Sequence, residues 1–353
     1  RLCRDWSSDV CSSDLTTFLR PQPIWNRSKQ RGTPMKYSMG SNLACYITQL
    51  IQQKRAIGFK YESQEYELWR FDKFCIKNHF DCSELTKEIA MHWARKQREE
   101  TISSQQSRIS PIRQLAKYIH SIGKPAFLIP KFIPGKTLKY IPHIYTDYEL
   151  KHFFLESDRF LYDKRYPERH LVMAVIFRMI YCCGLRQSEA RNLRMENVDL
   201  LNGVLHILDS KRRSRFVPLS EDIRLLCIRY SAVVEKIYPS RVWFFQNRYG
   251  MCYASNTLIY MFHQCWSKTK IEITNGNSPR IHDFRHSFSV RRLNLWIKEG
   301  KDLNSFLPYL SMYLGHETFV ETDYYLHFTD DFFPVFREKS AISESLIPEV
   351  ESL

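Results

Sequence analysis

The chain has 353 residues, of which 44% are hydrophobic and 25% charged, and its formal net charge is +14. These proportions fit a soluble globular protein of about two domains. A basic excess of this size is typical of proteins that bind a polyanion, most often nucleic acid, although a merely basic soluble protein would show it too. No apolar stretch approaches the roughly 18–20 residues of a membrane-spanning helix, which argues against a membrane partner.

Residues 1–15, RLCRDWSSDVCSSDL, follow neither a helical nor a strand period. From Asp5 onward, a permitted reverse translation of this segment looks like a common sequencing-library adapter. We therefore interpret 1–34 as an artefactual or disordered segment and expect the protein to start at Met35 or Met39. The alternative is a real disordered basic arm. Without 1–34 the chain loses six Lys/Arg and three Asp/Glu and stays basic.

Residues 35–123 are predicted to form a helical domain, because 41–56, 66–79, 86–98 and 103–123 place apolar residues at steps of three and four. Pro111 predicts a kink or break in the last of these helices. Basic side chains of that helix could lie on a face available to phosphates, the alternative being a solvated surface. These candidate DNA-binding residues are Arg108, Arg113 and Lys117.

Residues 124–145 carry four prolines in 125–142 and little periodicity, which predicts an extended basic linker between two domains. A second helical domain is predicted over 146–337, followed by a tail over 338–353. Within it, the runs 204–208 and 215–219 are of β type and flank SKRRS, so they predict a small hairpin. Trp243, Phe244 and Phe245 mark a further buried segment.

The ten cysteines form neither CxxC pairs nor the Cys/His spacing of a zinc site. Cys182 and Cys183 lie in an apolar run, which indicates buried thiols and a reducing cytoplasm. A phosphate-binding GxxxxGK[ST] loop and a Gly-rich dinucleotide fingerprint are also missing from the sequence. We therefore expect no cofactor, neither metal nor nucleotide.

Several chemically active residues occur in a fixed order, and together they suit the cleavage of a phosphodiester by a phenol. Guanidiniums bind the non-bridging oxygens through planar forks, and an imidazole exchanges protons near neutral pH. His282 and Arg285 are three residues apart and share a helix face. The set comprises Arg186 in GLRQSEA, Lys211 in SKRRSRFVPL, His282 and Arg285 in HDFRH, His316 in LGH, and the tyrosine pair Tyr324 and Tyr325.

Each of these signals also has an ordinary explanation when it stands alone. Arg186 could be a surface arginine at a helix start, and the HxxR spacing occurs often by chance. Lys211 lies at a predicted hairpin tip with Arg212, Arg213 and Arg215, which could form a non-specific phosphate-binding turn. The spacing alone leaves open which of the two tyrosines is the nucleophile.

With the pieces assembled, residues 40–330 resemble the tyrosine recombinase family, which includes Xer-type recombinases, phage integrases and transposon recombinases. GLRQSEARNL is similar to the family's first catalytic box, HDFRHSFSVRRL to the second and YLGHETFVETDYYLHF to the third. The resemblance implies a mainly α fold with a small β-sheet. It implies an N-terminal helical core-binding (SAM-like) domain and a C-terminal catalytic domain.

The resemblance also implies a role for each residue. Arg186 and Arg285 would bind phosphate, and His316 would donate a further hydrogen bond to it. Lys211 would be the general acid and His282 the proton acceptor. Tyr325 would be the nucleophile, because it precedes the Leu-His that matches the family's Tyr-x-His. Glu189 matches a supporting acidic position.

The implied activity is site-specific DNA recombination through a covalent 3′-phosphotyrosyl intermediate, without metal or ATP. The implied partners are double-stranded DNA, three further copies of the chain in a homo-tetramer on two DNA sites, and a related recombinase or accessory protein. The tail residues Phe332, Phe333, Val335 and Phe336 could dock on a neighbouring subunit or pack on their own domain. Two alternatives remain: a non-catalytic DNA-binding accessory protein on the same fold, and a type IB-like topoisomerase.

Overall fold

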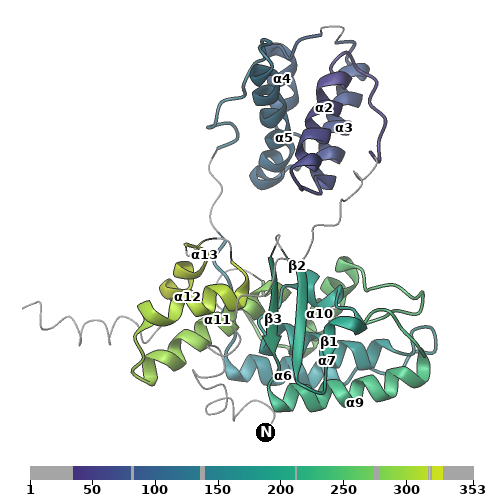
Figure 1. Ribbon diagram of the computed structural model, residues 1–353, viewed down its shortest axis with the longest axis vertical. Coiled ribbons are helices and arrows are strands. Elements are labelled where there is room, and N and C mark those ends of the chain that lie inside the picture. Colours follow the sequence, from purple (N-terminus) through teal and green to yellow (C-terminus); the bar gives the residue numbers. More distant parts are fainter. Residues whose placement is uncertain are drawn as a thin grey trace, which may run out of the picture. The chain divides into compact units, whose positions relative to one another are not determined.

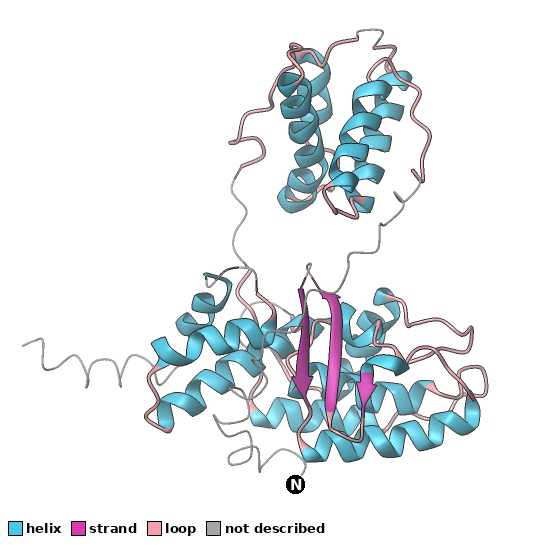
Figure 2. Cartoon of the chain, in the orientation of Figure 1, coloured by secondary structure: helices cyan, strands magenta, loops and turns pink. Residues whose placement is uncertain are grey.

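The computed structural model describes residues 35–80, 83–135, 140–210, 213–273, 278–316, 318 and 320–328. These residues form two compact units that divide between Tyr140 and Ile141, and each is described by itself. Figure 1 labels their helices and strands, and Figure 2 shows that the fold is mainly helical with one small sheet. The predicted fold class, mainly α with a small β-sheet, is confirmed.

The smaller unit is a bundle of four helices: α2 (Ala44–Ala56), α3 (Glu62–Lys77), α4 (Lys87–Ala94) and α5 (Ile102–Ser121). Their apolar residues recur every three or four positions, so each helix has one buried side. Ile47, Phe71, Trp93 and Ile112 are at most 4% exposed and lie in the resulting core. Thr86 and Thr101 cap the starts of α4 and α5 with their side-chain oxygens.

Pro111 lies inside α5, which runs without interruption from Ile102 to Ser121, so the predicted break does not occur. Proline removes one backbone hydrogen bond from a helix. Here Pro111 is itself buried, next to Ile109 and Ile112 in sequence, and both of these side chains are in the core. We infer that packing of the apolar side of α5 offsets the lost hydrogen bond.

The segment that precedes α2 is fastened to α3 by two buried carboxylates. The backbone N–H of Lys36 donates to Glu65 (2.7 Å), and those of Gly40 and Ser41 donate to Asp72 (2.9 Å each). Glu65 also pairs with Arg55 at 2.6 Å. The fold of the smaller unit therefore includes residues from Met35 onward.

The two ends of the predicted linker 124–145 pack on different units. Ile129 is buried in the core of the smaller unit, with Phe127 and Ile133 packed against it. At the other end, Tyr145 is buried in the larger unit, where its N–H donates to the Ser287 hydroxyl (2.9 Å) and its ring packs on Phe284. Part of the segment that the sequence assigns to an extended linker thus belongs to the two cores.

The larger unit contains a three-stranded antiparallel sheet in the order β1-β2-β3, formed by β1 (Val198–Asp199), β2 (Val204–Ser210) and β3 (Arg213–Pro218). In its register Leu205 pairs with Val217 and His206 with Phe216. Leu205 and Val217 are fully buried, whereas Phe216 is 45% exposed, as expected for a sheet with one covered face. The predicted hairpin is therefore confirmed.

The rest of the larger unit is helical, and α7 packs against several of the other helices. The helices are α6 (Asp147–Asp158), α7 (Arg169–Cys182), α8 (Gln187–Arg191), α9 (Glu221–Ile237), α10 (Ser255–Thr269), α11 (Ile281–Lys298), α12 (Leu303–Leu314) and α13 (Val320–Asp323), with 3-10 turns at Met195–Asn197 (η1) and Tyr324–Phe328 (η2). Helix α7 contacts α6, α9 and α11. Its buried residues join Phe153, Phe262 and Phe284 in one core, which fixes the position of α11.

None of the helices in the described ranges is long and apolar enough to cross a bilayer.

Candidate active site

A pocket of about 370 Å³ in the larger unit collects side chains from segments far apart in the sequence. It is lined by Arg186 before α8, by α11, by His316 after α12, and by α13 and η2. Six of the residues that the sequence singled out lie here together: Arg186, His282, Arg285, His316, Tyr324 and Tyr325. His286 also lines the pocket.

Arg186 is positioned by the turn that ends α7. Gly184 has a φ of +58°, and a Cβ there would lie 2.6 Å from the ring of Phe288 on α11. Only glycine allows this turn and this close approach, so the GLR motif brings Arg186 against the catalytic helix. The Arg186 guanidinium donates to Glu189 (2.8 Å) and to the carbonyl of Gly315 (3.1 Å).

Arg285 lies beneath the pocket and is 1% exposed. Its guanidinium donates to the carbonyls of Gly184 (2.8 Å) and Leu314 (2.6 Å), so it ties the first motif to the third. Burial lowers the pKa of Arg285 to about 10, assisted by the positive charge of Arg186. The group nevertheless stays cationic at neutral pH and can bind an anion in the pocket.

His316 follows Gly315, which ends α12 with a φ of +66°. The His316 ring is 5% exposed, and its Nδ1 is 2.7 Å from the hydroxyl of Thr322. It also stacks on the Tyr325 ring with 6.0 Å between centroids. Because the hydroxyl fixes one ring nitrogen, the orientation of the imidazole in the pocket is set.

Tyr325 is 3% exposed and packs among Phe288, Leu314 and other apolar residues. Burial raises the pKa of its phenol, while the positive charge of Arg285 and hydrogen bonds from Ser289 and Arg285 favour the phenolate. Tyr324 is more exposed, and burial and the neighbouring Tyr325 raise its pKa. The buried guanidinium of Arg285 is thus a hydrogen-bond partner of the Tyr325 phenol.

His286 is a pocket residue that sequence reasoning missed, although it is the last letter of HDFRH. It lies one helical turn after His282, with 4.8 Å between their rings and 5.4 Å to the Tyr325 ring. Burial, together with the charges of His282, Arg285 and Arg280, lowers the pKa of His286 to about 3. The i, i+4 spacing from His282 was the signal that could have identified it. Ser289, likewise one turn after Arg285, was missed too.

Arg215 was predicted to contact DNA, and in the structure its side chain has partners within the larger unit. Its side chain is 8% exposed and forms a two-pronged ion pair with Glu189, at 3.0 and 2.7 Å. Its Nε donates to the carbonyl of Tyr313 (2.7 Å). Each of the three guanidinium nitrogens therefore donates to a partner within the larger unit.

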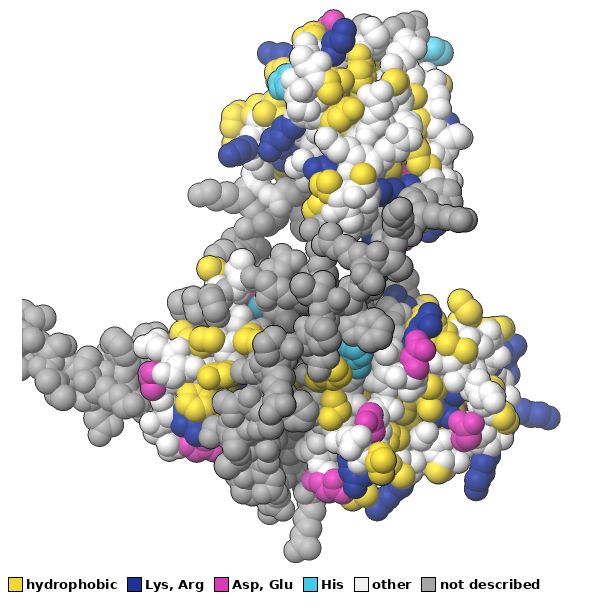
Figure 3. Space-filling model, in the orientation of Figure 1, with side chains coloured by type: hydrophobic (Ala, Val, Ile, Leu, Met, Phe, Trp, Pro, Cys, Tyr) yellow, Lys and Arg dark blue, Asp and Glu magenta, His cyan; other side chains and the backbone are white. Residues whose placement is uncertain are grey.

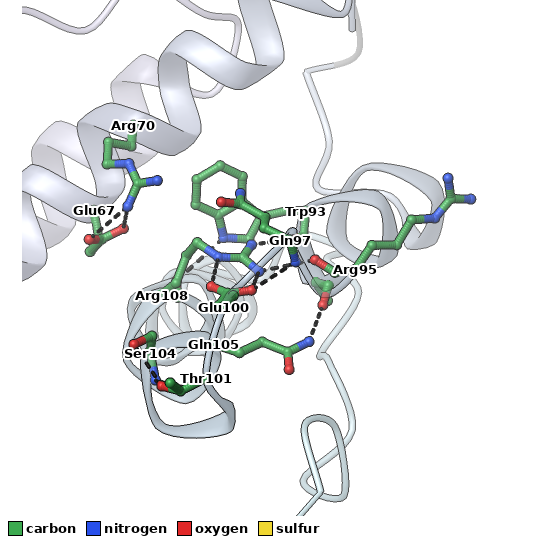
Figure 4. A network of polar contacts seen from close by, with 11 residues as sticks. Glu67, Arg70, Trp93, Arg95, Gln97, Glu100, Thr101, Ser104, Gln105 and Arg108 are labelled. Carbon is green, nitrogen blue, oxygen red and sulfur yellow. Dashed lines mark hydrogen bonds and ion pairs between the residues drawn. The ribbon is translucent and has the colours of Figure 1, made fainter.

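Arg108 was also predicted to contact DNA, and in the structure it is buried within the smaller unit. It is 2% exposed, and its Nε and Nη2 each donate to a carboxylate oxygen of Glu100 at 2.7 Å, as Figure 4 shows. It further donates to the carbonyls of Trp93 and Arg95. The helical period placed Arg108 on a polar side of α5, but that side is covered by the loop between α4 and α5.

The other predicted DNA contacts differ in their surroundings. Arg113 is partly buried and donates to the carbonyls of Ile129 (3.0 Å), Pro130 (2.6 Å) and Ile133, so it supports the segment after α5. Lys117 is exposed. Lys211, Arg212 and the side chain of Arg213 lie outside the described residues, as do the tail residues Phe332, Phe333, Val335 and Phe336.

The charges on the larger unit are of both signs on the side that Figure 3 shows. On its visible side, Figure 3 shows Lys and Arg side chains interspersed with Asp and Glu. Cationic groups are also close together in and beneath the pocket, where the carboxylate of Glu189 lies within 4 Å of three arginines. These are Arg186, Arg215 and Arg285.

Comparisons with known proteins converge on one family. The model of the phage integrase family matches residues 159–331. The y4rB protein of Sinorhizobium fredii, whose name describes it as an integrase/recombinase, is 27% identical over 304 residues, covering 79% of this chain and 91% of that protein. The tyrosine recombinase XerC of Staphylococcus saprophyticus is 22% identical, covering 81% of this chain and 92% of XerC.

Solved structures with the same fold include two recombinases. The XerH site-specific recombinase bound to palindromic difH substrate has a TM-score of 0.58 at 18% identity, covering 86% of each chain. The Tn1549 transposon integrase in complex with transposon right end DNA has a TM-score of 0.57 at 16% identity, covering 84% of this chain and 99% of that one.

Proposed function

Because this chain belongs to the tyrosine recombinase family and is a site-specific DNA recombinase, we propose that it cuts and rejoins double-stranded DNA through a covalent 3′-phosphotyrosyl intermediate. The observation that carries the proposal is the pocket shared by Arg186, Arg285, His316 and the buried Tyr325. These are the groups that an attack by phenolate on a phosphodiester requires.

In the proposed reaction, the scissile phosphate binds between Arg186 and Arg285. The Tyr325 oxygen attacks phosphorus while its proton passes to His282, and the P–O5′ bond breaks. Lys211 donates a proton to the leaving 5′ oxygen. The phosphotyrosyl ester keeps the energy of the broken bond, so a second 5′ hydroxyl can reverse the step without ATP.

We further propose a homo-tetramer on two DNA sites as the active assembly. The support is that XerH and the Tn1549 integrase were each solved on their DNA, and that this chain is strongly basic. A relaxing topoisomerase would act as a monomer. The mass of the complex formed with two site-containing duplexes separates these possibilities, since only the recombinase joins both duplexes in one complex.

A nicked suicide duplex that carries the recombination site tests the chemistry. The wild-type protein should form a DNA adduct that resists denaturant, Tyr325→Phe should form none, and Tyr324→Phe should retain it. An adduct in Tyr325→Phe would refute the assignment of the nucleophile. A complete lack of adduct in the wild-type protein that nevertheless binds the duplex would favour the accessory-protein alternative.

Arg186→Ala tests the phosphate-binding role in the same assay. Loss of one donor to a transition-state oxyanion costs about 100–1,000-fold in rate. We expect a decrease of that size in adduct formation at saturating DNA. An unchanged rate would contradict the proposed role of Arg186.

A further inference from the structure

Glu189 lies at a point where three catalytic-domain segments meet. Its Oε1 accepts hydrogen bonds from Arg186 (2.8 Å) and Arg215 (3.0 Å), and its Oε2 accepts from the Arg186 backbone N–H (2.8 Å) and from Arg215 (2.7 Å). Arg285 is 3.9 Å from the same Oε2. Glu189 is 8% exposed, so these interactions are only weakly screened by water.

Arg215 reaches this point from β3, and it also supports the turn before His316. Its Nε donates to the carbonyl of Tyr313 at 2.7 Å. A Cβ built on Gly315 would lie 3.0 Å from its Nη1, so the guanidinium packs directly against that turn. Arg215 thereby joins the hairpin, the Glu189 motif and the turn that carries His316.

The charges around Glu189 explain why this contact matters for the pocket. A carboxylate beside Arg186 competes with phosphate for the same guanidinium donors. The fork of Arg215 occupies both Glu189 oxygens and supplies a positive charge, which weakens the hold of Glu189 on Arg186. Without Arg215, Glu189 would interact more strongly with Arg186, and Arg186 would be drawn away from the phosphate.

We propose that Arg215 is a positioning residue for cleavage: by engaging Glu189 and the turn at Tyr313–Gly315, it keeps Arg186 and His316 set for the scissile phosphate. The proposal rests on the function proposed above. Arg215 itself does not contact DNA. It acts through Glu189 and the turn.

A buried ion pair could instead serve stability alone, so the experiment needs a control of that kind. Arg241 provides it, because its side chain is fully buried and donates to Glu235 (2.5 Å) and Ser231 (2.8 Å), outside the pocket. Arg241→Met should lower the melting temperature and leave the rate of adduct formation per folded molecule unchanged.

The test compares Arg215→Met, Arg215→Lys, Glu189→Gln and the double variant Arg215→Met/Glu189→Gln with the wild type. The rate of adduct formation is measured in single turnover at saturating suicide duplex, with the folded fraction determined by thermal melting. We expect Arg215→Met to be at least about tenfold slower than wild type. Arg215→Lys should be intermediate, since an ammonium keeps the charge and loses the fork.

The decisive comparison is the double variant, which should be about tenfold faster than Arg215→Met because a neutral amide no longer competes for Arg186. A double variant no faster than Arg215→Met would overturn the proposal. So would a rate in Arg215→Met within twofold of wild type, or an equal loss in Arg241→Met. Failure of the proposed function looks different, because the wild-type protein itself would then form no adduct.

Discussion

At the scale of single residues, the arginines of this protein divide by what lies opposite them. Arg186 and Arg285 line the pocket, whereas Arg108 and Arg215 form ion pairs with buried carboxylates away from its lining. All four are equally basic in the sequence. Their function follows from the partners that the fold brings to them.

Arg108→Met should destabilise the smaller unit by about 3–5 kcal/mol, because it leaves the Glu100 carboxylate partly buried without its partner. The affinity for DNA, measured where the variant is folded, should stay within about twofold of wild type. Urea unfolding and a DNA-binding titration check the two parts. The variant Arg108→Met/Glu100→Gln should recover part of the stability, and a large loss of affinity in the folded variant would restore Arg108 as a DNA contact.

The pKa of His286 predicts a pH dependence of stability. It is about 3 in the folded protein and near 6.5 in the unfolded chain, so below pH 6.5 the unfolded state takes up a proton that the folded state refuses. The stability that this residue contributes is therefore complete above pH 6.5 and is lost as the pH falls toward 3. His286→Phe should lose less unfolding free energy than wild type between pH 7 and pH 5. Identical pH dependence of wild type and His286→Phe would show that the pKa of His286 is not depressed.

At the scale of elements, each unit has a segment that is held on one of its helices by hydrogen bonds. The segment 35–41 is held on α3 by Glu65 and Asp72, and the segment before α6 is held on α11 through Tyr145. The second contact fixes the side of α11 opposite to the one that carries Arg285. Because α11 also packs on α7, its catalytic side is presented from a rigid support.

A chain that begins at Met39 should be less stable than one that begins at Met35. It lacks the Lys36 donor to Glu65 and the Tyr37 ring that stacks on Trp69 at 5.1 Å. Loss of a partner to a buried carboxylate costs about 1–3 kcal/mol. Thermal unfolding of the two forms and of the full chain checks this. A chain from Met35 that unfolded at a lower temperature than the full chain would contradict the interpretation of 1–34.

At the scale of the whole molecule, each unit has a hydrophobic core of its own. Fragments 35–135 and 141–353 should therefore each fold and unfold cooperatively, as circular dichroism melts can show. A fragment that stayed unfolded would indicate that its core depends on the other unit.

Binding of the intact chain to its DNA should depend steeply on salt. Each phosphate neutralised contributes about one unit to the slope of log K against log salt. Because Arg108 and Arg215 are paired internally, substituting either of them in folded protein should leave this slope unchanged. Substituting the exposed Lys117, which we expect to contact a phosphate, should lower the slope. Titrations at several salt concentrations measure the slopes.

The sequence by itself determined much of the local structure and predicted the chemistry that we propose. Apolar steps of three and four predicted the helices, β-type runs predicted the hairpin, and the order of the motifs predicted that two arginines, two histidines and a tyrosine act together. These features are local, or depend on residue types, so no folded partner is needed to recognise them.

Only the tertiary structure decided which side of each helix is covered and which charges meet. A helical period defines a polar side of α5 but not the loop that buries Arg108 against it. The pairing of Arg215 with Glu189 spans 26 residues, and that of Arg186 with the Gly315 carbonyl spans 129. Such contacts arise from the packing of α11 and the hairpin on one core. For that reason the burial and internal pairing of Arg108 and Arg215 could not be predicted from the sequence.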